Sequence, residues 1–489
     1  MRTLEQLNFD NTFARLPTTF YSRVKPTALA RPYLVSFNAD AAKLIDLSID
    51  ESLRDEFAQC FIGNQLPSGS EPLAMLYAGH QFGNFVAQLG DGRAILLGEV
   101  KNVTGEYWDI QLKGAGPTPY SRNGDGRAVL RSSIREYLCS EAMHGLGIPT
   151  TRALCIVGSD EEVYRETVER AAVVTRIAPS CIRFGSFEVF YHRGEYEPIK
   201  QLADYVIAKH FSHLANEADK YARFLHEVME STAKLMAQWQ SVGFSHGVMN
   251  TDNMSILGLT FDYGPFGFME TYDPAYICNH SDHGGRYAFN QQPQVGLWNL
   301  SALAQALTPL VSIEQAEAVL DAYGDVYAEY YVKLMSQKLG IQYAGLEDFA
   351  LIESLLKLLN VCQLDYTNLF RQLSQFKSAT AEVNSGLRDQ FMDRSAFDQW
   401  ADAYKIRLQA EDSDDAERKG RMDRVNPKYI LRNYLAQIAI GKAEKDRDYS
   451  EVDKLLRLLA RPFDDQPEME SYAAPAPEWA KNIEVSCSS

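Results

Sequence analysis

The sequence predicts an α+β protein in which a mainly β segment is followed by a mainly helical one. Short apolar runs around a Gly-Asp-Gly turn, and then an alternating run, give residues 86–114 the pattern of β-strands. Two more strand-like runs occupy 153–158 and 171–178. After about Leu202 the pattern changes to long amphipathic helices. The order of these two patterns is the basis of the predicted fold class.

Helices are predicted on both sides of that change. One begins near residues 132–133 and ends before Gly145. Over 221–239, apolar residues recur at the 3.6-residue spacing of one helix face, and Gly243 stands where such a helix would end. Further helices are predicted over 299–337 and 346–376.

The C-terminal part contains two segments with weaker patterns. The mixed-charge stretch at 411–424 is typical of a solvated linker. The last 28 or so residues contain four prolines, which predict an extended tail.

The composition excludes several classes of protein. Of the 489 residues, 46% are hydrophobic and 23% are charged, so the chain is not disordered throughout. Lys and Arg number 48 against 65 Asp and Glu, and the resulting net charge of −17 disfavours nucleic acid or an anionic membrane as a partner. We see no apolar run of the ~18 residues that a spanning helix needs, and no signal peptide. Seven scattered cysteines indicate a reducing compartment, so we expect a cytoplasmic protein.

Two motifs resemble functional signatures but lack their context. Residues 243–247 match the G-x-S-x-G nucleophile elbow, which follows a strand, whereas a helix is predicted before this segment. Residues 278–283 contain Cys, His and Asp, but a zinc site normally needs a second well-spaced pair, and none stands out. The phosphate-binding P-loop and the Rossmann glycine motif are both missing from the sequence. The sequence therefore predicts none of these four sites.

An ordered series of residues is suited to nucleotide binding. It begins with Gly90, Asp91, Gly92 and Arg93 at a turn, where backbone N–H groups can approach a phosphate closely. Lys113, at the end of the next strand, offers a point charge for phosphate oxygens. The series continues with Glu136 on the following helix, with a loop from His246-Gly247 to Asp252-Asn253, and with Asp262-Tyr263-Gly264.

These residues match the parts of a protein kinase in the same order. A kinase has a glycine turn over the nucleotide, a strand Lys paired with a helix Glu, a loop Asn on the metal and a D-F-G-type Asp on the metal. Asn253 and Asp262 would offer hard oxygen ligands to Mg²⁺ or Mn²⁺. One position departs from the pattern, because the residue five before Asn253 is Val248, which cannot accept a proton as the catalytic Asp does. Either the protein is inactive or another group serves, and Asp252 is the nearest candidate.

Each part of the series also has a purely structural interpretation. Ser133 and Glu136 form an S-x-x-E capping box, so Glu136 could satisfy a helix N-terminus. Residues 262–264 could be a simple turn, and Gly90 and Gly92 could mark a hairpin. The conserved order of the parts in kinases favours the functional interpretation over five separate coincidences.

The chain resembles the selenoprotein O family of protein-kinase-like adenylyltransferases. The resemblance extends over nearly the whole length and rests on these segments: NFDNTFARLP, YAGHQFGNFVAQLGDGRA, DIQLKGAGPTPYSRNGDGRAVLRSSIREYL, TRIAPSCIRFGSFE, FSHGVMNTDNMSILGLTFDYGPFGFM and NPKYILRNYL. The final Cys-Ser-Ser places Cys487 where eukaryotic relatives carry selenocysteine.

The resemblance implies an activity and a set of site residues. It implies that ATP binds in a flipped orientation and that AMP, rather than phosphate, is transferred to Ser, Thr or Tyr hydroxyls of proteins. Asp252 would be the base, Asn253 and Asp262 would hold the metal, and Lys113 would pair with Glu136. The nucleotide site would be completed by Gly90, Gly92, Arg93, Asp125, Gly126, Arg176 and Arg183. For each arginine the alternative is a surface salt bridge.

The resemblance also implies a division of the chain and a redox link. We expect an N-terminal extension over 1–70, a β-rich kinase-like lobe with the nucleotide site over 71–200, a helical lobe with the catalytic and metal loops over 201–345, and a helical extension with the tail over 346–489. Oxidation is expected to join Cys278 to Cys487. Two other functions remain open, namely a conventional phosphotransferase that uses the γ-phosphate and a nucleotide-binding pseudokinase scaffold without turnover.

Overall fold

The computed structural model describes residues 1–379 and 384–485. Its main sheet has eight strands in the order β1-β3-β6-β7-β10-β9-β2, with β8 also paired to β10, and its neighbouring strands are antiparallel. These strands are β1 (Tyr21–Arg23), β2 (Tyr33–Phe37), β3 (Leu73–Met75), β6 (Ala94–Lys101), β7 (Tyr107–Lys113), β8 (Ala128–Val129), β9 (Arg152–Tyr164) and β10 (Val168–Ala178). Two separate two-stranded ribbons are formed by β4 (Gly79–Gln81) with β5 (Asn84–Val86), and by β11 (Phe244–Ser245) with β12 (Gly267–Phe268).

Helices make up most of the remaining described chain. Those before the long helix α6 are α1 (Ala39–Leu44), α2 (Asp55–Phe61), α3 (Leu130–Gly145), α4 (Gly185–Arg193) and α5 (Tyr196–His210). From α6 on they are α6 (Lys220–Val242), α7 (Gln292–Ala306), α8 (Ile313–Asp321), α9 (Tyr323–Lys338), α10 (Phe349–Cys362), α11 (Tyr366–Leu373), α12 (Ser385–Arg388), α13 (Arg394–Ala410), α14 (Asp415–Asp423), α15 (Asn433–Asp446) and α16 (Ser450–Leu459).

The main sheet is covered on both faces because its central strands are apolar on both sides. Along β10, Ala172 and Val174 pack toward α3, whereas Ala171 and Val173 pack toward α1 and α2. This is the period-two alternation of a strand, and it divides the apolar residues of the sheet between two cores. The face on which α3 lies is the one that carries the site described below.

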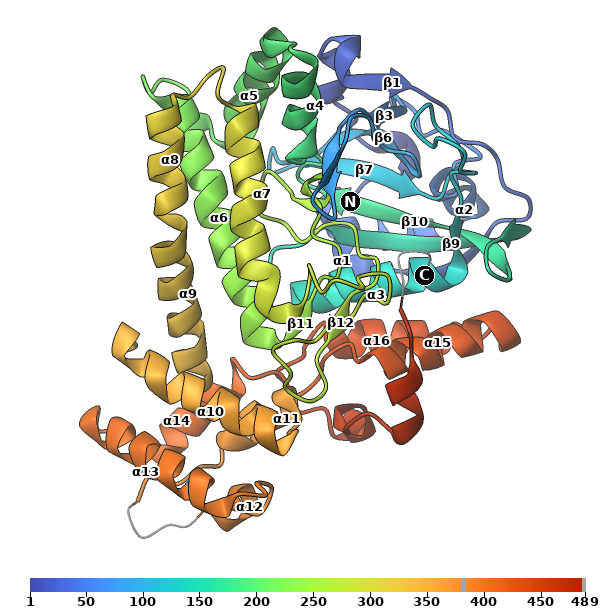
Figure 1. Cartoon of the computed structure of the whole chain (residues 1–489). Coiled ribbons are helices and arrows are strands. Elements are labelled where there is room, and N and C mark those ends of the chain that lie inside the picture. The colour runs from blue at the N-terminus through green and yellow to red at the C-terminus, as the bar shows by residue number, and fades with distance from the viewer. Residues whose placement is uncertain (380–383, 486–489) are drawn as a thin grey trace.

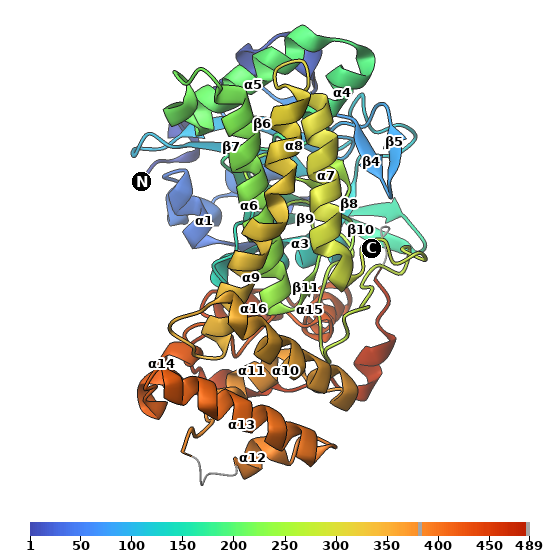
Figure 2. The same cartoon turned by 60° about the vertical axis from the view of Figure 1, so that its left-hand side comes forward.

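The long helices lie beside the sheet. In Figures 1 and 2, α6, α7, α8 and α9 run side by side, and α10 to α14 form a separate group at one end of them. That group has its own core, which includes Leu359, Phe370, Tyr404 and Met422. Helices α15 and α16 return from this end and pack against α3. No helix among the described residues is long and apolar enough to cross a membrane.

The predicted α+β class and its main elements are confirmed. Strands occupy the predicted runs in β6, β7, β9 and β10, and the predicted helix over 221–239 is α6. Gly243 caps α6 with a φ of 70°, a left-handed conformation that favours glycine. The first 70 residues contribute β1 and β2 to the main sheet, and the division of the chain into four segments stays a prediction.

Two local predictions and one structural alternative are wrong. Residues 411–424 are not a solvated linker, because they contain helix α14, whose N-terminus is capped by the Asp414 carboxylate and whose Arg418 is fully buried. The turn at 90–93 does not close a hairpin, since β5 pairs with β4 and β6 pairs with β3 and β7. The described part of the tail is not extended throughout, because it forms short 3₁₀ helices at Pro467–Ala473 and Glu478–Asn482.

Candidate active site

Strand alternation directs two cations toward α3. In the antiparallel pair of β7 and β10, Gln111 lies directly opposite Arg176. Ile110 and Leu112 of β7 pack into the core on the α1 and α2 side. Gln111 and Lys113 therefore project from the other face, together with Arg176. Arg176 Nη1 donates to Gln111 Oε1 at 2.8 Å, which fixes the guanidinium along the sheet.

Lys113 and Glu136 form the ion pair that the sequence predicts. Lys113 Nζ donates to Glu136 Oε2 at 2.6 Å. The capping-box interpretation of Glu136 is wrong, because α3 begins at Leu130 with Val129 as its N-cap, a few residues earlier than predicted. Glu136 is therefore well inside the helix, where backbone N–H groups already have partners, and its carboxylate is free to orient the lysine.

Asp262 is the centre of the site. Its Oδ1 accepts from Lys113 Nζ at 3.3 Å and from Arg176 Nη2 at 2.6 Å, and its Oδ2 accepts from Arg183 Nη1 at 2.9 Å. The backbone φ of Asp262 is 58°, a left-handed conformation that is uncommon outside glycine and concentrated at functional sites. Burial alone would raise the pKa of the Asp262 carboxyl, but the charges of Arg176, Lys113 and Arg183 hold it well below its usual range.

Arg176 and Arg183 are buried, so their interpretation as surface salt bridges is wrong. Only 2% of each side chain is exposed. Arg176 Nη2 also donates to Glu136 Oε1 at 2.6 Å. Both guanidinium groups lie over the ring of Phe261, at 4.4 and 4.3 Å from its centroid, and that of Arg183 lies 4.2 Å from the Tyr77 centroid. Their planar charge is thus held between aromatic rings and carboxylates.

Asp91 is a site residue to which the sequence analysis gives no role of its own, although it names Asp91 as part of the turn at 90–93. It lies between Gly90 and Gly92 and is almost fully buried, with its Oδ1 3.6 Å from Arg183 Nη2. Burial raises the pKa of its carboxyl. A Cβ on Gly90 would come within 2.5 Å of the Tyr120 ring, so glycine is needed there for packing. A charged residue between two glycines was the sequence signal for this inward turn.

The loop after α6 brings Val248, Asp252 and Asn253 to the same place. Asn253 Nδ2 donates to the Val248 carbonyl at 3.0 Å, which fixes the amide of the predicted metal ligand. Asp252 is 7% exposed, and its Oδ2 accepts from Gln81 Nε2 at 3.3 Å. Within 1–379 and 384–485, nothing donates a hydrogen bond to its buried Oδ1. Burial raises the pKa of the Asp252 carboxyl to about 7, against the opposing charge of Arg183.

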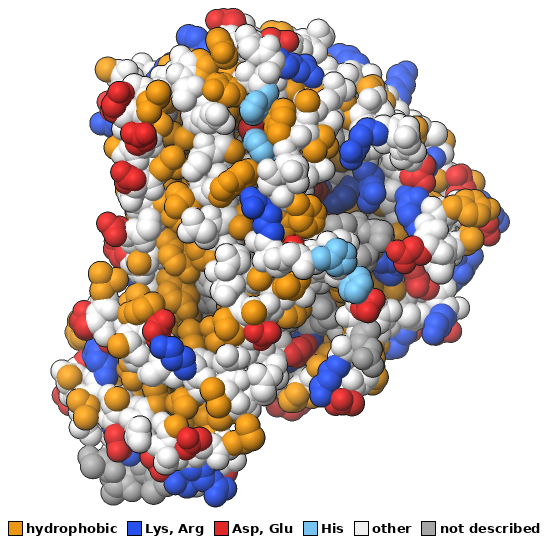
Figure 3. Space-filling model, viewed as in Figure 1, with side chains coloured by type: hydrophobic (Ala, Val, Ile, Leu, Met, Phe, Trp, Pro, Cys, Tyr) orange, Lys and Arg blue, Asp and Glu red, His pale blue; other side chains and the backbone are white. Residues whose placement is uncertain are grey.

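Two adjoining cavities, of about 450 and 610 Å³, meet at these side chains. Figure 3 shows Lys and Arg side chains gathered in a hollow on this face of the molecule. Both cavities are lined by Gln81, Arg93, Lys113, Arg122, Asp252 and Asp262. Arg122 and Gln81 were not predicted as site residues, although both lie in segments that carry the family resemblance.

Every predicted site residue lines one of the two cavities. The smaller cavity is lined by Glu136 and Asn253 in addition to the shared residues. The larger cavity is lined by Gly90, Gly92, Asp125, Gly126, Arg176 and Arg183. Asp125 is held by Arg165, whose Nη1 and Nη2 donate to its two carboxylate oxygens at 2.8 and 2.9 Å. Gly126 has a φ of 66°, and a Cβ on it would lie 2.1 Å from the Gly116 carbonyl oxygen.

The residues beside the cavities suit a hard divalent cation. Oδ1 of Asp262 already accepts from two cations, whereas Oδ2 accepts from Arg183 and keeps a further lone pair. Asn253 donates through its amide nitrogen, and this leaves its amide oxygen as a ligand. The buried Oδ1 of Asp252 is an acceptor without a donor among the residues described. Carboxylate and amide oxygens are ligands that Mg²⁺ and Mn²⁺ prefer.

The two motifs that resemble a nucleophile elbow and a zinc site contain buried residues with structural roles. Ser245 is fully buried in β11, and His246 Nε2 lies 2.9 Å from the Phe261 carbonyl oxygen, so residues 243–247 form no nucleophile elbow. Cys278 is buried, and its thiol donates to the Pro265 carbonyl at 2.8 Å. Burial raises the pKa of that thiol to about 12. Cys487 lies outside the described residues, and its link to Cys278 stays a prediction.

Comparison with known proteins decides the family. A family model described as protein adenylyltransferase SelO matches residues 3–460. The chain belongs to the SelO family of protein adenylyltransferases. It is 60% identical to a protein of Thiobacillus denitrificans, 55% identical to one of Myxococcus xanthus and 50% identical to one of Pseudomonas aeruginosa, with full coverage of both chains in each case. All three relatives are named protein nucleotidyltransferase YdiU, and this SelO-family chain is accordingly a nucleotidyltransferase.

The ion pair of Lys113 can be tested with a matched substitution on the same helix. Glu136→Gln is expected to lower label transfer from α-labelled ATP by about 10²-fold, because a displaced lysine misplaces the phosphates. Glu141→Gln is the control, since Glu141 is equally buried in α3 and pairs with Arg152 at 2.7 Å. We expect both variants to melt at lower temperature and only Glu136→Gln to lose activity. Full activity in Glu136→Gln would contradict the account.

Proposed function

We propose that this SelO-family chain transfers AMP from ATP to Ser, Thr or Tyr hydroxyls of proteins, including its own, in the cytoplasm and with Mg²⁺ or Mn²⁺. The fold we propose for it is a two-lobed kinase-like one, with the main sheet in one lobe and α6 to α9 in the other. One observation carries the proposal. Val248, at the kinase position of the catalytic Asp, is apolar, whereas Asp252 lines the same cavity and is buried with only one of its carboxylate oxygens hydrogen-bonded among the described residues.

The phosphates of ATP would be bound by the cations that face the cavities. Lys113, Arg93 and Arg122 line both of them, and arginine binds phosphate oxygens in pairs. Arg176 and Arg183 are occupied by carboxylates, so their main role is to hold Asp262 and to add positive charge at the inner end of the larger cavity. Backbone N–H groups of the turn at Gly90 and Gly92 would add neutral donors.

Asn253 and Asp262 would hold the divalent cation. When bound, the cation neutralises charge that develops on the phosphates. Mg²⁺ and Mn²⁺ both favour oxygen ligands, so the amide oxygen of Asn253 and the carboxylate of Asp262 suit either ion.

Asp252 would act as the general base. Its carboxylate accepts the proton of the substrate hydroxyl as the hydroxyl oxygen attacks the α-phosphorus. The bond from the α-phosphorus to the bridging oxygen then breaks, and diphosphate leaves with its charge facing Arg93 and Lys113. Attack at the α-phosphorus requires the nucleotide to lie with its α-phosphate beside Asp252 and its β- and γ-phosphates farther into the cavities.

The two alternative functions are less well supported. A conventional phosphotransferase needs a proton acceptor at the position of Val248, where the side chain is apolar and 9% exposed. The buried Oδ1 of Asp252 has no hydrogen-bond donor among the described residues, and such a group lowers folding stability. A pseudokinase scaffold without turnover gives no reason for this loss of stability.

Labelled nucleotides distinguish the three functions. We expect ATP labelled at the α-phosphate to mark protein in the presence of Mg²⁺ or Mn²⁺, and ATP labelled at the γ-phosphate to leave protein unmarked. Label from the γ position would identify a conventional kinase. ATP binding without label from either position would identify a scaffold.

Removal of the general base should separate chemistry from binding. Asp252→Asn keeps the shape of the side chain, which packs against Gly79. We expect transfer from α-labelled ATP to fall by roughly 10²–10⁴-fold, which is the usual contribution of a general base, with ATP affinity within a few-fold of wild type. Unchanged transfer would show that Asp252 is not the base, and equal loss of binding would show that it acts on the nucleotide instead.

A further inference from the structure

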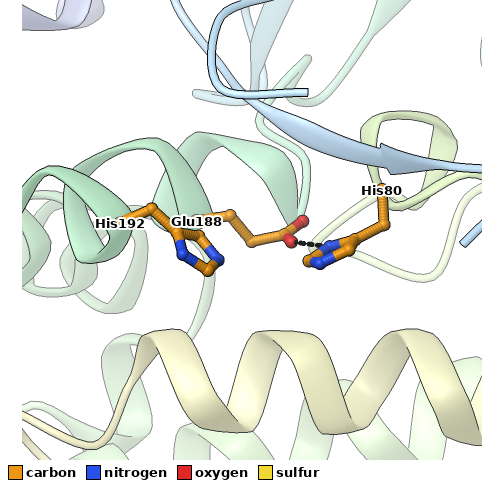
Figure 4. A group of neighbouring side chains, drawn as sticks. All are labelled: His80, Glu188 and His192. Atoms are coloured by element: carbon orange, nitrogen blue, oxygen red, sulfur yellow. Dashed lines mark hydrogen bonds and ion pairs between the residues drawn. The ribbon is translucent and has the colours of Figure 1, made fainter. Parts of the chain in front are cut away.

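A second group of metal-ligating side chains lies outside both cavities. It consists of His80 on β4 and of Glu188 and His192, one turn apart on α4, and Figure 4 shows the three side chains directed toward one another. One ligand atom from each residue lies within 4.8 Å of the others, and no other group of this kind occurs among the residues that the structure describes. Residues four apart on a helix lie on the same face, so α4 presents two ligands together.

The carboxylate in this group is buried and incompletely satisfied. Only 1% of the Glu188 side chain is exposed, and its Oε2 lies 2.5 Å from His80 Nδ1. Its Oε1 is buried and has no hydrogen-bond partner in the described parts of the chain. A buried carboxylate oxygen without a donor is unfavourable unless a cation or a water completes it.

Aromatic side chains hold the two imidazoles on the open side of the group. The ring of His192 packs on Phe85, with centroids 3.9 Å apart, and the ring of His80 contacts Trp298 of α7 at 5.1 Å. His192 is exposed, so an ion can reach the group from solvent. The carboxylate thus lies at the inner end and the imidazoles lie between it and water.

We propose that His80, Glu188 and His192 bind one divalent transition-metal ion of the zinc type. Two imidazoles and one carboxylate are a common set of three protein ligands for Zn²⁺, with water at the fourth position. Imidazole nitrogen favours such ions over Mg²⁺, which prefers oxygen. This site is therefore chemically distinct from the oxygen ligands of Asn253 and Asp262.

The ion would fix the ribbon of β4 and β5, which Figure 2 shows beside α7, to helix α4. The ribbon is joined to the loop of the candidate base at successive residues. The His80 backbone N–H donates to Thr251 Oγ1 at 2.7 Å, and Gln81 Nε2 donates to Asp252 Oδ2 at 3.3 Å. Metal binding would therefore position Gln81 and Asp252, a consequence that rests on the proposed function, whereas the site itself does not.

The site is tested by zinc binding to the full-length protein without nucleotide. Metal-free protein is titrated with Zn²⁺ against a chromophoric chelator, and we expect one ion per chain to bind. His192→Ala, at an exposed position, should weaken this affinity by at least about 100-fold, since even outer partners of metal ligands contribute 10–100-fold. His213→Ala is the matched control, because His213 pairs with Glu227 at 2.6 Å on the surface and belongs to no group of three ligands within the described parts of the chain. It should leave the affinity unchanged.

Two results would overturn the proposal. One is a zinc affinity of wild-type protein that is no higher than that of His192→Ala. The other is a zinc affinity of His213→Ala that is lowered as much as that of His192→Ala. Glu188→Gln provides a second variant, which keeps both imidazoles and should also lose the ion while its circular dichroism stays that of wild type. Because none of these measurements contains ATP, failure of the zinc site is distinguishable from failure of adenylyl transfer.

Discussion

The carboxylate of Asp262 is the group on which the rest of the site depends. Three cations from three parts of the chain converge on it, Lys113 at the end of β7, Arg176 in β10 and Arg183 before α4. Glu136 and Asp91 supply the other negative charges that balance them. Removing one member of such a buried network leaves a charge without compensation, at a cost of about 3–5 kcal/mol. The network therefore constrains the sheet, α3 and the loop that carries Asp262 to one arrangement.

Strand alternation and one loop bring the charged side chains of the site together. Alternation along β7 and β10 places Lys113 and Arg176 on one face, and α3 crosses that face with Glu136 directed at both. The loop after α6 brings Asp252 and Asn253 to the same cavity, while the β4–β5 ribbon covers Asp252 through Gln81. The candidate catalytic groups on loops are thus held by rigid elements around them, as preorganised catalysis requires.

Parts of this arrangement could be predicted from the sequence because they follow local patterns. Strand and helix patterns, together with the order of parts in a kinase, predict Arg93 at a turn, Lys113 at a strand end, Glu136 on the next helix and the loop residues 246–264. The family resemblance adds Arg176 and Arg183. The burial of Arg176 and Arg183 could not be predicted, because their ion-pair partners include Asp262, 86 residues from Arg176, and Asp91, which is farther still from Arg183, and ion pairing leaves no periodic signal. Helix α14 was missed for a related reason, since its charged sequence is typical of a solvated segment, whereas Met422 packs into the core of α10 to α14 and the buried Arg418 donates a hydrogen bond to the Phe376 carbonyl. His80 and Glu188, 108 residues apart, are joined by the fold alone.

The orientation of the nucleotide tests the central claim most directly. A structure of the protein with Mn²⁺ and an ATP analogue that resists cleavage between the α- and β-phosphates gives the distances from the Asp252 carboxylate to each phosphorus. The account predicts that the α-phosphorus is the nearest, with the β- and γ-phosphates directed toward Arg93 and Lys113. A γ-phosphorus nearest to Asp252, with the α-phosphate farthest away, would contradict it.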